Sequence, residues 1–344
     1  MSLRLEESPY AYVRTVVMRT SLLGKDDYDK LLKMRFAEIA RYLAEHGYRE
    51  EINSLASAYA GAELIERSLH LSMANSMEKL KRISPGGVQQ LISHYLRQYD
   101  VRNVKAIIRA IYLKRSADEI REVLIPVGSL SMQDMDELLK KASLIEVIRA
   151  SGIIAPEEIT RKMHEAAAAH DIQRLCNAMD KAYYQRLLSF AESLPKVGAA
   201  VRELLKLELK ATNVMAIIKL RREGFSAEDI AHHLISPDKE DIRLTRSESL
   251  QGLFKKLARS AFGPELKNAI RSYEQDASLI PIESALARAV LKKTLTLQHK
   301  NPLSIEVTIG YMFAKENEVK NIRTLVKAKQ AGFTETEVAD HLVI

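Results

Sequence analysis

The sequence predicts an all-α protein of three similar helical domains, and three observations support this prediction. One helical segment occurs three times along the 344 residues, about 110 residues apart. The composition is dominated by Leu, Ile, Ala, Lys, Arg and Glu, and a composition of this kind favours helices over sheets. Sustained alternation of apolar and polar residues is missing, as are the Asn-Gly and Asp-Gly pairs typical of hairpin turns.

The repeated segment is marked by an asparagine inside an apolar helical stretch. Asn103, Asn213 and Asn321 lie 110 and 108 residues apart, and seven of the nine prolines occupy equivalent positions relative to them. Proline is restricted to helix starts and turns, so matching prolines indicate matching turns. A period of this length is typical of a domain, whereas solenoid repeats have about 20–50 residues. We therefore predict helical repeat domains over residues 1–128, 129–236 and 237–344.

Each copy is expected to begin with amphipathic helices. Apolar residues recur at helical spacing in "YDKLLKMRFAEIARYLAEH", "MDKAYYQRLLSFAES" and "ESALARAVLKKTLTLQ". The asparagine helix follows, and Gly224 and Gly332 are placed to end it, since glycine tolerates the left-handed conformation needed there. In the first copy Lys114 takes the place of this glycine, which predicts a different turn.

A short closing helix is expected after this turn. A serine or threonine stands thirteen residues beyond each asparagine, and an acidic residue stands sixteen residues beyond it. This is the spacing of a capping box, in which the two side chains satisfy each other's unpaired amides. Each cap stabilises its helix by about 1 kcal/mol. The three pairs are Ser116 with Glu119, Ser226 with Asp229, and Thr334 with Glu337.

The composition is that of a globular protein without a membrane-spanning segment. Apolar residues make up 47% of the chain, far more than in a disordered protein. The longest stretch without Asp, Glu, Lys or Arg has 14 residues (83–96), whereas a membrane span needs about 20 apolar residues. The N-terminus lacks the apolar core of a signal peptide, and the single Cys176 favours a reducing compartment. We expect a soluble protein that reaches a membrane only through a partner.

The three asparagines have two interpretations. Asparagine is a poor helix former, so its presence in three apolar helices requires a reason. It could make equivalent contacts with a ligand or partner, or its side-chain amide could tie the helix to a neighbouring loop. The structural role is favoured, because three domains that contact different partners would rarely keep one ligand contact.

Basic residues gather on one face of two asparagine helices. A solvated face, with cations favoured near the helix C-terminus, explains them without a function. Electrostatic docking to an acidic partner is the functional alternative. The candidate partner contacts are Arg102, Lys105 and Arg109 in the first copy, and Lys320, Arg323 and Lys327 in the third.

No catalytic, cofactor-binding or metal-binding residues are predicted. The nine histidines include no i, i+4 pair of a helical metal site. The phosphate-binding motif GxxxxGK[ST] is missing, as are GxGxxG and GxSxG. The acidic groups lie at expected helix starts, where the helix dipole favours negative charge. The protein is therefore predicted not to be an enzyme and to need no cofactor.

Four segments resemble one family, the C subunits of archaeal-type (A-type) ATP synthases, which are related to the d subunits of vacuolar ATPases. They are "SPYAYVRTVVMRTSLLGKDDYDKLLKM", "LRQYDVRNVKAIIRA", "LELKATNVMAIIKLRREGFSAEDI" and "NEVKNIRTLVKAKQAGF", and the resemblance extends over essentially the whole chain. It implies a funnel of three helical domains with pseudo-threefold symmetry, peripheral to the cytoplasmic face of the cell membrane. It also implies a non-catalytic adaptor between the proteolipid rotor ring and the D and F proteins of the central stalk. The direction of ATP chemistry, the ion transported and the ring stoichiometry stay open.

Two other function classes compete with this interpretation. A basic helical scaffold for nucleic acid would explain the net charge of +7. However, residues 129–236 contain 15 Lys and Arg against 15 Asp and Glu, and aromatic residues are not interleaved with the basic ones for base stacking. Nucleic acid is therefore not expected as a partner. The third class, an enzyme with an unrecognised helical active site, would be revealed by an ATPase assay.

Overall fold

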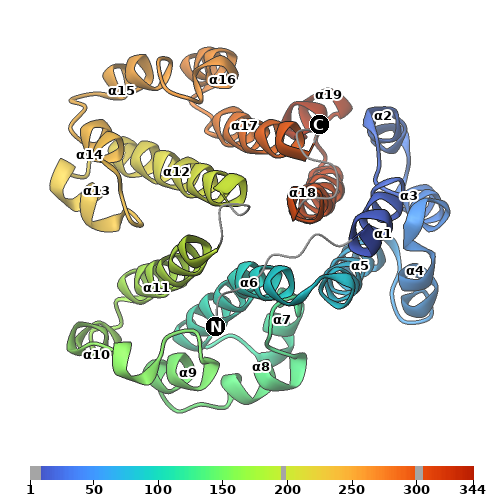
Figure 1. Ribbon diagram of the computed structural model, residues 1–344, viewed down its shortest axis with the longest axis horizontal. Helices are drawn as coiled ribbons and strands as arrows, with labels where there is room; N and C mark the ends of the chain where they lie inside the picture. Colours follow the sequence, from blue (N-terminus) through green and yellow to red (C-terminus); the bar gives the residue numbers. More distant parts are fainter. Residues whose placement is uncertain (1–8, 195–198, 299–304) are drawn as a thin grey trace. The chain divides into compact units, whose positions relative to one another are not determined.

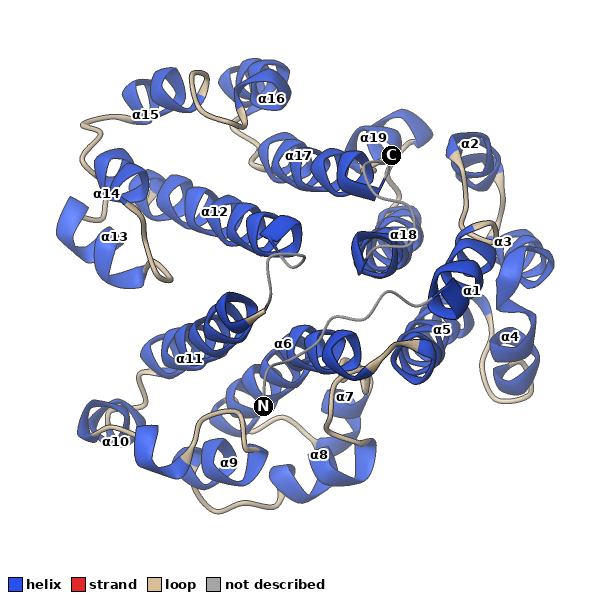
Figure 2. Cartoon of the chain, viewed as in Figure 1, coloured by secondary structure: helices blue, strands red, loops and turns tan. Residues whose placement is uncertain are grey.

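The computed structural model describes residues 9–194, 199–298 and 305–344. Within these ranges the chain forms helices and connecting loops, and no residue is in a strand (Figure 2). The prediction of an all-α fold is therefore confirmed. The arrangement of three domains about a pseudo-threefold axis stays a prediction.

The helices before Pro85 are α1 (Pro9–Arg19), α2 (Lys25–Lys33), α3 (Phe36–Leu43), α4 (Arg49–Leu55) and α5 (Gly61–Ile83), with a π-helical segment at Ala44–Tyr48 (Figure 1). The next are α6 (Gly86–Tyr112), α7 (Ala117–Arg121), α8 (Met132–Leu139), α9 (Leu144–Ser151), α10 (Arg161–Ala168) and α11 (Ile172–Ser193), with a 3₁₀ turn at Pro156–Glu158. The last are α12 (Ala199–Arg222), α13 (Ala227–His233), α14 (Lys239–Thr245), α15 (Leu250–Leu257), α16 (Gly263–Asp276), α17 (Ile280–Gln298), α18 (Ile305–Gln330) and α19 (Glu335–His341).

These helices form two compact units. The first unit covers Gly86–Pro195 and contains α6 to α11. The second covers Leu5–Pro85 together with Lys196–Ile344 and contains the other helices. The first unit therefore begins directly after a repeat proline, and it runs across residues 128 and 129. The division at 128 and 236 follows the sequence repeat and stays a prediction.

In the first unit, α6 is the central helix. It contacts α11 and the shorter helices α7, α8 and α9, while α10 lies against α9 and α11. Its buried residues include Val101, Val104 and Ile108, which recur at helical spacing on the side that faces these neighbours. The Tyr183 hydroxyl of α11 also donates to the Tyr95 carbonyl of α6 at 2.9 Å.

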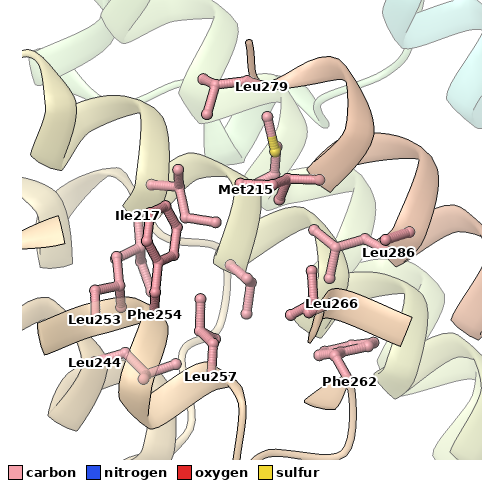
Figure 3. Packing of buried hydrophobic residues seen from close by; sticks show 14 of the residues in the cluster. Met215, Ile217, Leu244, Leu253, Phe254, Leu257, Phe262, Leu266, Leu279 and Leu286 are labelled. Carbon is pink, nitrogen blue, oxygen red and sulfur yellow. The ribbon is translucent and has the colours of Figure 1, made fainter. Parts of the chain in front are cut away.

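One core of the second unit lies between α12, α17 and the shorter helices α14 to α16 (Figure 3). Ile217 of α12 and Leu286 of α17 belong to this cluster, together with Phe254, Phe262 and Leu266 from the α15 and α16 region. Full burial of one such side chain stabilises the fold by about 1.5–3 kcal/mol. The amphipathic pattern of the sequence thus leads directly to a packed helical core.

A second part of the same unit joins helices that are far apart in the sequence. α18 packs against α5 and α1 near the N-terminus, as well as against α17. The pairing of two long helices thus occurs three times: α6 with α11, α12 with α17, and α18 with α5. An amphipathic helix must bury its apolar face against another element. The helices before Pro85 provide that cover for α18.

The amphipathic run at residues 28–46 is two helices, not one. α2 ends at Lys33, and the extended backbone of Met34 and Arg35 (ψ 151° and 164°) separates it from α3. The Glu38 carboxylate accepts the Arg35 amide at 2.7 Å and so supports a new helix start. Both helices bury their apolar faces, so the apolar pattern continues across the break and conceals it. The runs at 179–193 and 283–298 lie within α11 and α17.

The prediction of a different turn at Lys114 is wrong. Lys114 has a φ of 53°, in the same left-handed region as Gly224 (85°) and Gly332 (81°). In all three copies the next amide donates to the carbonyl five residues before it, at 3.0, 3.1 and 3.0 Å. This is the Schellman helix ending. A lysine thus adopts the same helix ending, although glycine adopts it with less strain.

Candidate functional site

Each repeat asparagine makes the same pair of hydrogen bonds. Its Nδ2 donates to a backbone carbonyl at 2.8–2.9 Å, and the amide of the same residue donates back to its Oδ1 at 2.9–3.0 Å. We call this contact the asparagine bridge. The three bridges join Asn103 to Ile125, Asn213 to Ile235 and Asn321 to Val343, each across 22 residues.

The asparagine bridge is positioned by the short closing helices. α7, α13 and α19 start at Ser116, Ser226 and Thr334, whose side chains accept the amides three residues later. The chain then returns to the long helix, and the bridge partners lie beyond the closing helices, without a helical hydrogen-bond partner. The asparagine satisfies both the N–H and the C=O of its partner, as a neighbouring strand would. Since the asparagines are 1–3% exposed, their contact is internal to each copy.

The first basic set, Arg102, Lys105 and Arg109, is divided by the structure. Lys105 Nζ binds both carboxylate oxygens of Asp180 on α11 at 2.8 Å, and 18% of its side chain is exposed. Arg102 donates to Gln98 Oε1 at 2.8 Å, whereas Arg109 is exposed. Lys105 therefore ties α6 to α11, which leaves the two arginines as the outward-facing members of this set.

The second basic set, Lys320, Arg323 and Lys327, lies along α18. Lys320 and Lys327 are exposed and Arg323 is half-buried. The closest carboxylate to Lys327 is that of Glu66 on α5, at 3.9 Å, and the lysine side chain remains 52% exposed. An ion pair of this kind contributes about 0–1 kcal/mol. These cations are therefore available to an acidic surface.

A histidine that the sequence patterns did not single out lies beside the second basic set. His70 of α5 is largely buried, and its Nε2 has no hydrogen-bond partner within the described ranges. Burial is the main cause that lowers the pKa of His70 to about 4, and the nearby cations Arg323, Lys327 and Arg67 contribute to the same shift. Only the packing of α5 on α18 brings these groups together, so no local sequence signal identifies them.

A buried charged cluster in the second unit was likewise not predicted from the sequence. Lys315 Nζ lies 2.9 Å from Glu318 Oε1 and 3.0 Å from the Tyr48 hydroxyl, which itself donates to Glu318 at 2.6 Å. The other Glu318 oxygen accepts the amide of Leu23. Burial raises the pKa of Tyr48, and the adjacent Glu318 carboxylate raises it further, so the hydroxyl stays a donor. The cluster joins α18 to the helices before Pro85.

The position three residues before each asparagine is polar in all three copies. Asp100 accepts the amide of Leu130 at 2.9 Å, directly before α8. Lys210 contacts Asp238, the N-cap of α14, at 3.0 Å. Glu318 takes the same position in the third copy. These side chains differ in charge, but each contacts the residues at the start of a short helix (α8, α14 and α2, in turn), and the differing residue types hid the common role.

Metal and membrane sites have no basis in the residues that the structure describes. Those residues contain no group of three His, Cys, Asp or Glu side chains that could hold a metal ion. Their helices include none long and apolar enough to cross a bilayer. Cys176 is buried, and burial raises the pKa of its thiol, which suits a core residue rather than a nucleophile.

Comparisons with known proteins agree with this architecture. The family model described as ATP synthase (C/AC39) subunit matches residues 11–341. The C subunit of the A-type ATP synthase of Halorubrum lacusprofundi is 33% identical, with 97% of each chain covered. That of Haloquadratum walsbyi is 31% identical over 98% of this chain and 99% of its own. That of Methanosarcina barkeri is 28% identical, with 98% and 92% covered.

These matches extend over nearly the whole chain and confirm the resemblance seen in its repeats. Members of this family are structural and non-catalytic, and the complex to which they belong is membrane-associated. The helical repeats and the family match together show that the chain belongs to the ATP synthase (C/AC39) subunit family, as a peripheral, non-catalytic part of an A/V-type ATP synthase.

Proposed function

We propose that this protein is the central-stalk adaptor of the complex. It couples the membrane rotor ring of proteolipid subunits to the D and F proteins of the central stalk, at the cytoplasmic face of the cell membrane. In this role it passes torque between transport of protons or sodium ions and synthesis or hydrolysis of ATP. Its membrane association is through the ring only.

The recurrence of one internal tie in three helix pairs is the observation that carries this proposal. A torque-transmitting element must resist deformation, and close-packed helical interiors have low compressibility. Each asparagine bridge fixes a closing helix to its long helix with two buried hydrogen bonds. The Lys105 and Asp180 ion pair adds a tie between the long helices of the first unit. These internal ties make the helix pairs resistant to deformation, which a subunit that transmits torque requires.

The exposed basic residues suit its docking. Lys320 and Lys327 are exposed on α18, and Arg102 and Arg109 are exposed on α6. Charged groups at the rim of an interface accelerate association and make it dependent on salt. We propose that these four residues and Arg323 contact acidic or carbonyl-rich surfaces of the ring or stalk.

Reconstitution of the whole complex in vesicles tests the adaptor role. Complexes assembled without this protein should still hydrolyse ATP in the head, but ATP-driven ion uptake should be lost. Adding the wild-type chain should restore uptake. Ion uptake that is equal with and without the chain would disprove the coupling role.

A charge-reversal variant tests the docking surface. Arg323→Glu/Lys327→Glu should weaken incorporation into the complex, more strongly at low salt than at high salt. The matched control is Arg161→Glu/Lys162→Glu, which reverses the same charge at two exposed positions on α10. Equal incorporation of the two variants would show that the α18 cations do not dock.

A further inference from the structure

One face of α1 is apolar and exposed. Tyr10, Val13 and Val17 are 61%, 55% and 60% exposed, and Val16 beside them is exposed as well. With 3.6 residues per turn, the first three lie within about 60° of one another around the helix. Among the side chains that the structure describes, no other helix exposes more than one large apolar residue to this degree. We call these four residues the α1 strip.

The opposite face of α1 is buried. Ala11, Thr15 and Met18 lie on the side of the helix that packs against α18 and α5 (Figure 1). A surface helix normally presents polar residues to solvent opposite its buried face, whereas a helix that is apolar all round is buried on every side. The α1 strip therefore has the composition of a buried surface, although the described part of the chain leaves it uncovered.

α1 is an addition to the repeated module. The closing helices α7 and α13 are followed by α8 and α14, and the connecting residues 122–131 and 234–238 form no helix. In the third copy the closing helix α19 packs against α2, as α13 packs against α14. α1 precedes α2 and so has no counterpart in the other two copies. The pairs α6 with α11 and α12 with α17 form without such a helix, so completing a helix pair does not explain α1.

The spacing of the α1 strip is that of a helix–helix seam. Tyr10, Val13 and Val17 follow one another at intervals of three and four residues, as do the residues that anchor one helix against another. Valine is branched at Cβ and stiff at χ1, so it packs against a facing helix with little loss of side-chain freedom. Helices that bind a membrane surface instead present Trp, Phe or Leu on their apolar face. The strip thus favours a protein helix over a lipid surface.

The charges around the α1 strip indicate the kind of helix that fits. Arg14 is exposed and directly follows Val13, at the flanking position from which paired helices form ion pairs across their seam. The exposed charged residues of α18, against which α1 packs, are Lys320 and Lys327. All exposed charges of these two helices are therefore positive. α1 contains no Asp or Glu, so a second copy of α1 offers Arg14 no carboxylate.

From these observations we infer that the α1 strip docks an amphipathic helix of another protein of the complex. The facing helix carries apolar residues along its seam and Asp or Glu beside them. The inference rests on the proposed function, which places neighbouring proteins around this chain. Burial of the apolar side chains supplies affinity, whereas Arg14 at the rim makes association dependent on salt.

Cysteine labelling in the isolated chain and in the reconstituted complex tests this inference. In the isolated chain, Val13→Cys should react with a water-soluble maleimide as fast as the control Ala58→Cys, at an exposed position after α4. In the complex, labelling of Val13→Cys alone should slow by at least about tenfold. The wild-type chain, whose single Cys176 is buried, gives the background. Equal labelling of Val13→Cys in the two states would overturn the inference.

A charged strip should also weaken assembly. Val13→Asp/Val17→Asp should lower the affinity for the rest of the complex by at least about tenfold, because a carboxylate cannot be buried in an apolar seam. The matched control Ser57→Asp/Ala58→Asp adds the same charge at two exposed positions in the same unit. Both double variants should melt like the wild-type chain in isolation, since all four side chains are exposed. Equal assembly of the two double variants would contradict the docking role.

Other occupants of the α1 strip predict different results, and each would overturn the inference. Protection of Val13→Cys in the isolated monomer would show that the chain covers the strip itself, and protection that appears only with dimers in sedimentation would show a second copy. Flotation of the isolated chain with anionic phospholipid vesicles, abolished by Val13→Asp/Val17→Asp, would assign the strip to a membrane. Failure of the wild-type chain to join the complex would instead contradict the proposed function.

Discussion

The Glu318 carboxylate accepts a hydrogen bond from the Leu23 amide at 2.5 Å, although 295 residues separate the two in sequence. In the first copy the corresponding contact joins Asp100 to Leu130, only 30 residues away. The same contact thus serves a local turn in one copy and a long-range closure in another. The helices before Pro85 pack against α18, as α11 and the shorter helices α7 to α9 pack against α6. This relationship makes the Glu318 cluster the most informative place to perturb the fold.

Replacing Glu318 by Gln should destabilise the protein by about 3–5 kcal/mol, because Lys315 would be left as a buried, unpaired charge. Urea unfolding with a probe in the second unit measures this. The double variant Lys315→Met/Glu318→Leu should lose less than the sum of the two single changes. As a control, Glu165→Gln removes an exposed ion pair with Arg161 and should change stability by less than about 1 kcal/mol. A cost for Glu318→Gln as small as the control's would show that the cluster does not stabilise the unit.

Replacing Asn213 by Ala should cost about 2–4 kcal/mol. The change removes three hydrogen bonds, two with Ile235 and one with Asp241, and leaves the amide and carbonyl of Ile235 buried without a partner. Chemical denaturation gives the free energy of unfolding. The control Thr212→Ala changes the exposed neighbour and should stay within about 0.5 kcal/mol. Similar effects for the two variants would contradict the bridging role.

Acidification should destabilise the second unit through His70. Its folded pKa of about 4 lies below the usual value of 6.5, so the unfolded chain binds the proton first as pH falls. The contribution of the neutral histidine to the free energy of unfolding is fully present above pH 6.5 and is lost progressively as the pH falls to about 4. The loss is up to about 3 kcal/mol in the free energy of unfolding.

Urea unfolding at several pH values between about 7 and 4 checks this expectation. His70→Leu should flatten the dependence of stability on pH, whereas His164→Leu, at an exposed position, should leave it unchanged. Parallel pH profiles for wild type and His70→Leu would rule out this histidine as the source.

Replacing Lys114 by Gly should stabilise the protein by about 1 kcal/mol. Lys114 has a φ of 53°, in a region that costs a residue with a Cβ atom about 1–2 kcal/mol and glycine nothing. The reverse change, Gly224→Lys, should destabilise by a similar amount, since Gly224 has open space but a φ of 85°. Melting temperatures of the two variants should therefore move in opposite directions. Shifts of the same sign would show that the turn conformation does not limit stability.

The sequence alone determined the helical class, the three copies of the repeat and the turns at Gly224 and Gly332. These features are local: helical spacing of apolar residues, glycine at a helix end and a hydroxyl before a carboxylate are read within about one helix length. The asparagine bridge spans 22 residues of a repeat that occurs three times, so its structural interpretation was also within reach. The family resemblance followed from the same repeats.

Only the tertiary structure decided which polar groups meet. Lys105 pairs with Asp180 across 75 residues, and Glu318 meets Leu23 and Tyr48 across 295 and 270. The physical reason is that the apolar face of a helix must be buried, but its sequence does not determine which other helix covers it. The ion pairs of charged side chains depend on which helices pack together.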